Sequence, residues 1–235
     1  MEGAYPIHYL FRMSEGTEVE FTVRLDPETL LNVAPLPEAA PEWTRLEFQK
    51  CPNCSLAPQQ MPLCPTAAQL VEAAAGFSQT LSFEEAEVRV DVPERSMSAR
   101  TTVQAGLSSL LGIYMSTSGC PILAKLRPMV RFHLPFATPL ETMFRSTSMY
   151  LVGQFLRMQE GHAPDWTLAG LADTYRETAE VNRAFARRLW AASEKDANIN
   201  ALILLDVFTK AVSDSIEDRL VELKSIFSAW DGPAG

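Results

Sequence analysis

The four cysteines are the residues whose types and spacing could do chemistry in this chain. Cys51 and Cys54 form a C-x2-C pair (CPNC), Cys64 follows ten residues later, and Cys120 lies 56 residues further on. A C-x2-C turn directs two sulfurs at one cation, and a structural tetrahedral site needs two more soft ligands. The chain has no other thiols to supply them. We therefore predict a metal site formed by Cys51, Cys54, Cys64 and Cys120.

The surroundings of Cys64 and Cys120 favour this prediction. Cys64 lies two residues before Thr66, a candidate helix cap, and Cys120 directly precedes Pro121, a residue suited to the first turn of a helix. A sulfur at a helix N-terminus is stabilised as a thiolate, the form that binds metal. Only half of the usual double C-x2-C pattern is present, however, so a redox-active or disulfide pair and inert buried cysteines stay open as alternatives.

Zinc is the expected ion, because it is the usual occupant of sites built from four thiolates and CPNC is typical of a zinc knuckle. An iron–sulfur cluster is the alternative. Cys-Pro occurs at Cys51, Cys64 and Cys120, and this dipeptide is found in ferredoxin cluster motifs. Either group would join the N-terminal part of the chain to the C-terminal part through Cys120, so we expect them to fold as one cooperative unit.

Period-two patterns predict the strands that precede and follow this cysteine segment. Apolar and polar residues alternate over 17–25 and 87–92, and turn residues separate each run from a β-prone partner at 7–13 and 97–103. A further strand is predicted over 43–48, leading into Cys51. We expect a small, mostly antiparallel sheet of four or five strands.

Helices are predicted for most of the remaining chain. Seven of the sixteen prolines lie between positions 35 and 65, whereas residues 171–231 contain neither Pro nor Gly. Capping boxes are predicted at Thr66 with Gln69 and at Thr138 with Glu141. Apolar residues from Leu202 onward recur every 3.5 residues, which predicts one continuous seam that packs on the same chain or forms a dimer interface. The expected helices are 66–76, 103–117, 121–127, 139–160, 167–193 and 198–230.

These elements predict an α+β fold: a small N-terminal antiparallel sheet, a Cys-rich irregular segment and then a multi-helix bundle. Residues 1–103 would form the β-rich half, with Cys51, Cys54 and Cys64. Residues 104–235 would form the helical half, joined to the first through Cys120.

Composition excludes several function classes. A net charge of -9 argues against a dedicated nucleic-acid binder. Uninterrupted apolar runs are far shorter than the roughly 18 residues of a membrane span, and the first residues lack a signal-peptide pattern, so we expect no membrane partner and a cytoplasmic location. Phosphate loops, metalloprotease motifs and nucleophile elbows are absent from the sequence. His133, in an apolar setting between two helices, is expected to be structural.

A complete set of structural ligands without a catalytic set predicts a non-enzymatic, metal-stabilised adaptor, regulatory or assembly protein. Its helices would contact a protein partner or a second copy of the chain. Two alternatives stay open: an iron–sulfur redox sensor or electron-transfer protein using the same four cysteines, and an enzyme with a polar pocket in the helical half and His133 as an acid–base group.

The segment YLFRMSEGTEVEFTVRLDPETL, followed by CPNC, LCP and SGCP, resembles an uncharacterised family of bacterial cytosolic proteins, a domain of unknown function. The resemblance covers most of the chain. It implies no activity, so the functional prediction rests on the residues themselves.

Overall fold

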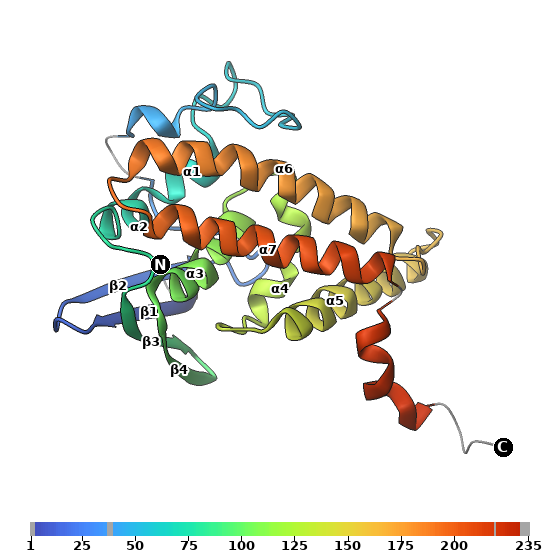
Figure 1. Ribbon diagram of the computed structural model, residues 1–235. Coiled ribbons are helices and arrows are strands. Elements are labelled where there is room, and N and C mark those ends of the chain that lie inside the picture. The colour runs from blue at the N-terminus through green and yellow to red at the C-terminus, as the bar shows by residue number, and fades with distance from the viewer. Residues whose placement is uncertain (1–2, 37–39, 219, 231–235) are drawn as a thin grey trace.

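A four-stranded antiparallel sheet and the helices packed against it form the structure, which confirms the α+β prediction (Figure 1). The structure is a computed structural model that describes residues 3–36, 40–218 and 220–230. Helices α6 (Ala169–Ala192) and α7 (Ala197–Glu217) lie side by side across the molecule, on the far side of the central helix α3 (Val103–Thr117) from the sheet (Figure 1). None of the described helices has the length and apolar character needed to cross a membrane.

The sheet consists of two hairpins joined by their first strands. Its strands are β1 (Tyr5–Met13), β2 (Glu18–Leu25), β3 (Glu85–Val92) and β4 (Arg95–Thr102), in the spatial order β2-β1-β3-β4. Phe11 on β1 pairs with Val88 on β3, and both side chains are fully buried; alternate residues along β1, β2 and β3 are buried, whereas the inward residues of the edge strand β4 are only half-buried. One face of the sheet therefore lies in the core, as the period-two patterns predict.

The strand predicted over 43–48 is wrong. Residues Glu42–Thr44 form a short 3₁₀ helix, η1, and only Arg45 makes an isolated β-bridge, with Leu63. Three carbonyl groups of this segment accept hydrogen bonds from one arginine side chain, so they are not available to a neighbouring strand. The sheet has four strands in the described part of the chain.

Three of the predicted helices have nearly the expected bounds, and the one over 167–193 is α6 (Ala169–Ala192). The helix over 103–117 is α3, and the helix over 139–160 is α5, which begins with the predicted capping box of Thr138 and Glu141. The region 121–127 forms 3₁₀ rather than α-helical turns. The helices are α1 (Pro65–Gln69), α2 (Val71–Gly76), α3 (Val103–Thr117), η2 (Leu123–Leu126), α4 (Pro128–Arg131), α5 (Pro139–Gln159), α6 (Ala169–Ala192), α7 (Ala197–Glu217) and η3 (Val221–Trp230).

The capping box predicted at Thr66 is absent. Cys64 is the N-cap residue instead, and the Thr66 hydroxyl forms a hydrogen bond of 2.8 Å with Ser118. Gln69 accepts a hydrogen bond from Asn32, so its side chain is not available to the helix start. Both side chains therefore form hydrogen bonds with residues distant in the sequence instead of forming the capping box.

The continuous helix predicted over 198–230 is also wrong. α7 ends at Glu217, and the chain turns at Leu220, whose φ of 54° lies in the left-handed helical region. The Leu220 amide donates to the Ser215 carbonyl at 2.8 Å, which closes the end of α7. The apolar residues of the predicted seam therefore belong to two helices, α7 and η3, rather than to one.

The main hydrophobic core lies between the sheet and α3. The packing is tight at Gly106 of α3, where a β-carbon would lie 2.8 Å from both Phe11 and Val88. Phe185 of α6 and Leu202 of α7 belong to the same core. Because this core contains residues of both predicted halves, residue 103 does not separate two independent cores.

Candidate metal centre

The four cysteines lie on three separate elements. Cys51 and Cys54 occupy a turn after η1, in which the Cys54 amide donates to the Cys51 carbonyl at 3.1 Å. Cys64 is the N-cap of α1. Cys120 follows α3 at a sharp turn, where Gly119 has a φ of 91°, a conformation that favours glycine. All four are free and half-buried.

The fold places these four thiols within electrostatic range of one another. The pKa of Cys51 rises to about 11, first because the thiol is buried and then because Cys64, Cys120 and Cys54 lie nearby. Cys120 is in turn influenced by Cys64 and Cys54. Residues up to 69 positions apart in the sequence are thus neighbours in space.

Proximity alone does not make a formed metal site. In the described residues, no three or more His, Cys, Asp or Glu side chains are arranged to hold a metal ion. The thiols therefore influence one another's pKa but are not arranged as the ligands of one ion. Metal binding at Cys51, Cys54, Cys64 and Cys120 stays a prediction.

Backbone amides support two of the sulfurs. Burial raises the pKa of the Cys64 thiol, and hydrogen bonds from the Ala67 and Thr66 amides oppose that rise. Burial likewise raises the pKa of Cys120, against hydrogen bonds from the amides of Leu123 and Ile122. Such N–H donors stabilise negative charge on sulfur. The expectation that both cysteines lie at the start of helical turns is borne out.

Arg188 is a buried residue near the cysteines that the sequence analysis missed. This arginine lies on α6 and is only 1% exposed. Its guanidinium donates hydrogen bonds to the carbonyl oxygens of Trp43 (2.8 Å), Arg45 (2.7 Å) and Leu46 (2.9 Å), directly before the CPNC turn. Its Nε has no hydrogen-bond partner in the part of the chain that the structure describes. The spacing from Val181 and Phe185, both buried on α6, could have placed Arg188 on the buried face.

The charge of Arg188 has no carboxylate partner in the described ranges. Burial lowers the pKa of its guanidinium, and the nearby Cys64, Cys51 and Cys54 thiols act in the opposite direction. An unpaired buried cation is costly unless an anion lies close to it. The neighbours of Arg188 that can become anionic are the cysteines.

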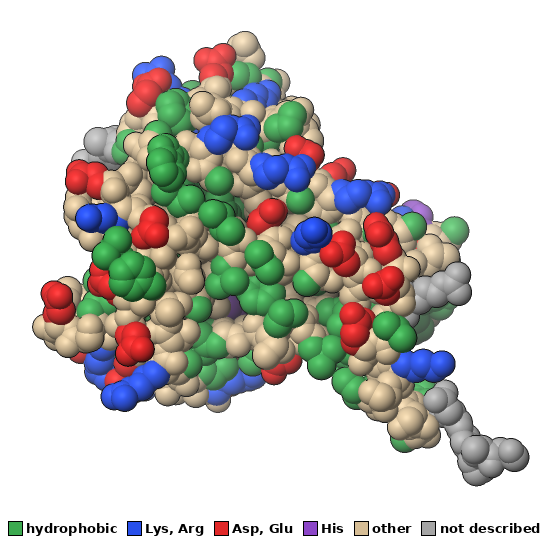
Figure 2. Space-filling model, in the orientation of Figure 1, with side chains coloured by type: hydrophobic (Ala, Val, Ile, Leu, Met, Phe, Trp, Pro, Cys, Tyr) green, Lys and Arg blue, Asp and Glu red, His purple; other side chains and the backbone are tan. Residues whose placement is uncertain are grey.

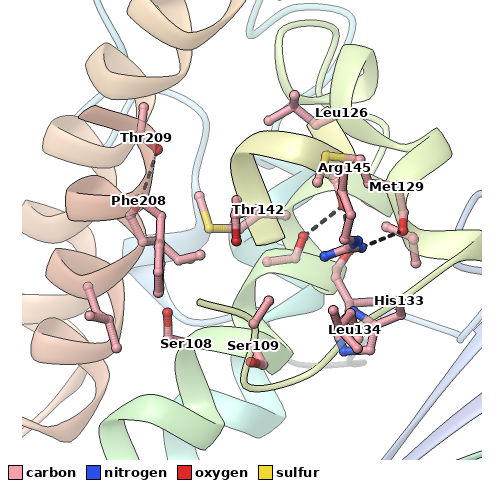
Figure 3. A pocket seen from close by; sticks show the side chains of 18 of the residues that line it. Ser108, Ser109, Leu126, Met129, His133, Leu134, Thr142, Arg145, Phe208 and Thr209 are labelled. Atoms are coloured by element: carbon pink, nitrogen blue, oxygen red, sulfur yellow. Dashed lines mark hydrogen bonds between the residues drawn. The ribbon is translucent and has the colours of Figure 1, made fainter. Parts of the chain in front are cut away.

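A second set of polar side chains lines a cavity of about 350 Å³ between α3 and the helices α4 to α7 (Figure 3). His133 is one of them. Its Nε2 lies 2.6 Å from the hydroxyl of Tyr9, and burial, followed by the charge of Arg145, lowers the pKa of His133 to about 3. The ring is therefore neutral at physiological pH and hydrogen-bonded, as a structural histidine is. An acid–base role for His133 stays a prediction.

Comparison with known proteins tests the resemblance found in the sequence. No curated protein and no solved structure matches the chain significantly. One family model does match it, over residues 7–228, and therefore includes the sheet, all four cysteines and Arg188. On this match the chain belongs to the family described as "Domain of unknown function (DUF6901)".

Proposed function

We propose that the chain is a zinc-stabilised, non-enzymatic adaptor, regulatory or assembly protein. In this proposal Cys51, Cys54, Cys64 and Cys120 bind one Zn²⁺. The observation that carries the proposal is the buried charge of Arg188, which has no carboxylate partner among the described residues and lies near the thiols of Cys51, Cys54 and Cys64.

The charges of the two groups are complementary. Four thiolates around Zn²⁺ carry a net charge of 2−, because four negative charges exceed the two positive charges of the ion. The guanidinium of Arg188 neutralises half of this charge, and the amides at Cys64 and Cys120 donate hydrogen bonds to the sulfurs. Without an ion, deprotonating these buried thiols is unfavourable. Zn²⁺ would reverse that preference by displacing the thiol protons.

The ion would fix a segment that has little regular structure of its own. The two ends of the chain between η1 and α1 are joined by the bridge of Arg45 with Leu63, whereas its middle makes isolated contacts, such as the hydrogen bond from Asn53 Nδ2 to the Glu177 carbonyl of α6. Four ligands would connect this segment to the end of α3. Binding energy at such a site contributes directly to the stability of the fold.

An exposed apolar surface supports the partner role. Val152, Phe155 and Leu156 on α5 are 49–59% exposed, and η3 adds Ile226 and Phe227. Figure 2 shows hydrophobic side chains gathered where these elements lie. Contiguous exposed apolar side chains are typical of protein interfaces. We propose that this surface binds a protein partner or a second copy of the chain.

Metal analysis of anaerobically purified protein tests the zinc site. We expect about one zinc per chain, and loss of that zinc in Cys54→Ser together with reduced thermal stability. Ser55→Ala is the matched control, because Ser55 is the exposed neighbour of Cys54. Protein that contains far less than one zinc or iron per chain, with Cys54→Ser as stable as the wild type, would overturn the proposal.

An iron–sulfur cluster on the same four cysteines is the second candidate, and the repeated Cys-Pro dipeptide favours it. Metal analysis of the same anaerobically purified protein distinguishes the zinc site from the iron–sulfur cluster. A brown protein with iron and sulfide would support the cluster and a redox or electron-transfer role, whereas a colourless protein with stoichiometric zinc would remove it.

A further inference from the structure

The cavity between α3 and the helices α4 to α7 has the size and lining of a ligand site. Its volume of about 350 Å³ falls within the range of small-molecule pockets. Most of its wall is apolar, with Ile113 from α3, Leu126 from η2 and Phe208 from α7 among the lining side chains. Figure 2 shows hydrophobic side chains around a hollow near the middle of this face.

One positive charge lines this apolar space. Arg145 of α5 donates hydrogen bonds through a single nitrogen, Nη2, to the carbonyl oxygens of Met129 (3.1 Å) and Phe132 (3.0 Å). Figure 3 shows its guanidinium beside Met129, above His133. Glu141, one turn earlier on α5, is the nearest candidate partner in sequence, but its carboxylate is bound to Thr138 in the capping box. Arg145 makes no ion pair with any residue that the structure describes.

A hydroxyl group in the same wall also lacks a partner. Ser108 of α3 is 3% exposed and lines the cavity, and its Oγ atom has no hydrogen-bond partner among the described residues. A buried polar atom of this kind has a free-energy cost unless something binds it. Ser108 and Arg145 therefore both have unused hydrogen-bonding capacity toward the cavity.

We propose that this cavity binds an organic carboxylate with an apolar body, whose head group pairs with Arg145. A cavity of about 150 Å³ holds benzene, so one of about 350 Å³ holds roughly a dozen non-hydrogen atoms. A ten-carbon fatty acid has this size. The apolar wall takes the chain, and Arg145 takes the carboxylate, which a cation in a desolvated setting binds more strongly than in water.

Isothermal titration calorimetry with decanoate and 1-decanol at neutral pH tests the proposal. The two probes share the apolar chain and differ in the charge of the head group. We expect wild-type protein to bind decanoate at one site, at least tenfold more tightly than 1-decanol. Absence of decanoate binding at millimolar concentration, or equal affinity for the two probes, would overturn the proposal.

Three variants locate the site. Arg145→Met should abolish the preference for decanoate, while Arg157→Met, at an exposed position on the same helix, should keep it. Gly112→Leu should prevent binding of both probes, because Gly112 lines the cavity and a β-carbon there meets only Leu205, at 3.6 Å. Unchanged decanoate affinity in Gly112→Leu would place binding elsewhere and contradict the proposal, even if Arg145→Met fails to fold.

Discussion

Replacement of Arg188 by Met tests whether this buried arginine supports the cysteine segment. Met is long and apolar, so it fills much of the same volume, but it cannot donate hydrogen bonds to the carbonyl groups of Trp43, Arg45 and Leu46. Each buried acceptor left unpaired costs about 1–3 kcal/mol. Removing an unpaired buried charge returns part of that loss.

We expect Arg188→Met to lower the free energy of unfolding by about 3–4 kcal/mol after this offset. At about 2–4 °C per kcal/mol for a chain of this size, Tm falls by roughly 6–16 °C. Circular dichroism at matched metal content measures the change. Arg187→Met is the control, because Arg187 is exposed and contacts only Gln49 and the backbone of its own helix, so it should change stability by less than about 0.5 kcal/mol.

The metal affinity of the same variant tests the proposed charge pairing. Without the positive charge of Arg188, a site of net charge 2− is less stable, so we expect Arg188→Met to lose zinc to a chelator at lower concentrations than Arg187→Met does. Arg188→Lys, which keeps the charge, should fall between them. If Arg188→Met is as stable as the wild type and retains zinc equally well, the reasoning about this residue is refuted.

Three further predictions concern the fold. Gly106→Ala should lower the free energy of unfolding by about 1–3 kcal/mol in chemical denaturation, because its β-carbon would lie 2.8 Å from side chains on β1 and β3. Gly153→Ala in α5 should instead raise the free energy of unfolding by up to about 1 kcal/mol, since no described atom outside its own helix backbone lies within 4 Å of the added β-carbon. Thr138→Ala should cost about 1 kcal/mol by the same measurement, since it removes the capping box of α5. Hydrogen bonds, first from the Thr167 hydroxyl, lower the pKa of Asp165. The carboxylate therefore stabilises the fold above about pH 4, the pKa of an unfolded Asp, and this contribution is lost as the pH falls toward the lower pKa of the folded protein. Chemical denaturation at a series of pH values should show a weaker pH dependence of stability in Asp165→Asn.

Local patterns predicted much of the fold because local interactions determine those elements. Alternation fixes the buried face at Val88 and Val90, and the Thr138 capping box fixes the start of α5. The prediction of secondary structure failed where residues distant in the sequence determine the local conformation. The carbonyls after Trp43 are bound by Arg188, 145 positions away, and α7 ends with neither Gly nor Pro to mark the turn at Leu220.

The features of the candidate site, like those of the fold, could be predicted only in part from the sequence. The metal-site hypothesis led us to expect that the four thiols would be neighbours, because a C-x2-C turn needs two further soft ligands from elsewhere in the fold to complete a tetrahedral site. The charge of Arg188 could not be assigned to them, since an arginine on a helix is usually exposed. A polar pocket in the helical half with His133 stood among the alternatives, but the largely apolar lining of the cavity was not predicted, because its residues come from many elements and no single segment carries a recognisable pattern.

X-ray absorption spectroscopy at the zinc edge, on protein purified without added metal, tests the central proposal most directly. Four sulfur ligands at about 2.3 Å are expected, one from each of Cys51, Cys54, Cys64 and Cys120. A protein without bound metal, or a zinc ion surrounded by nitrogen and oxygen ligands only, would contradict the account.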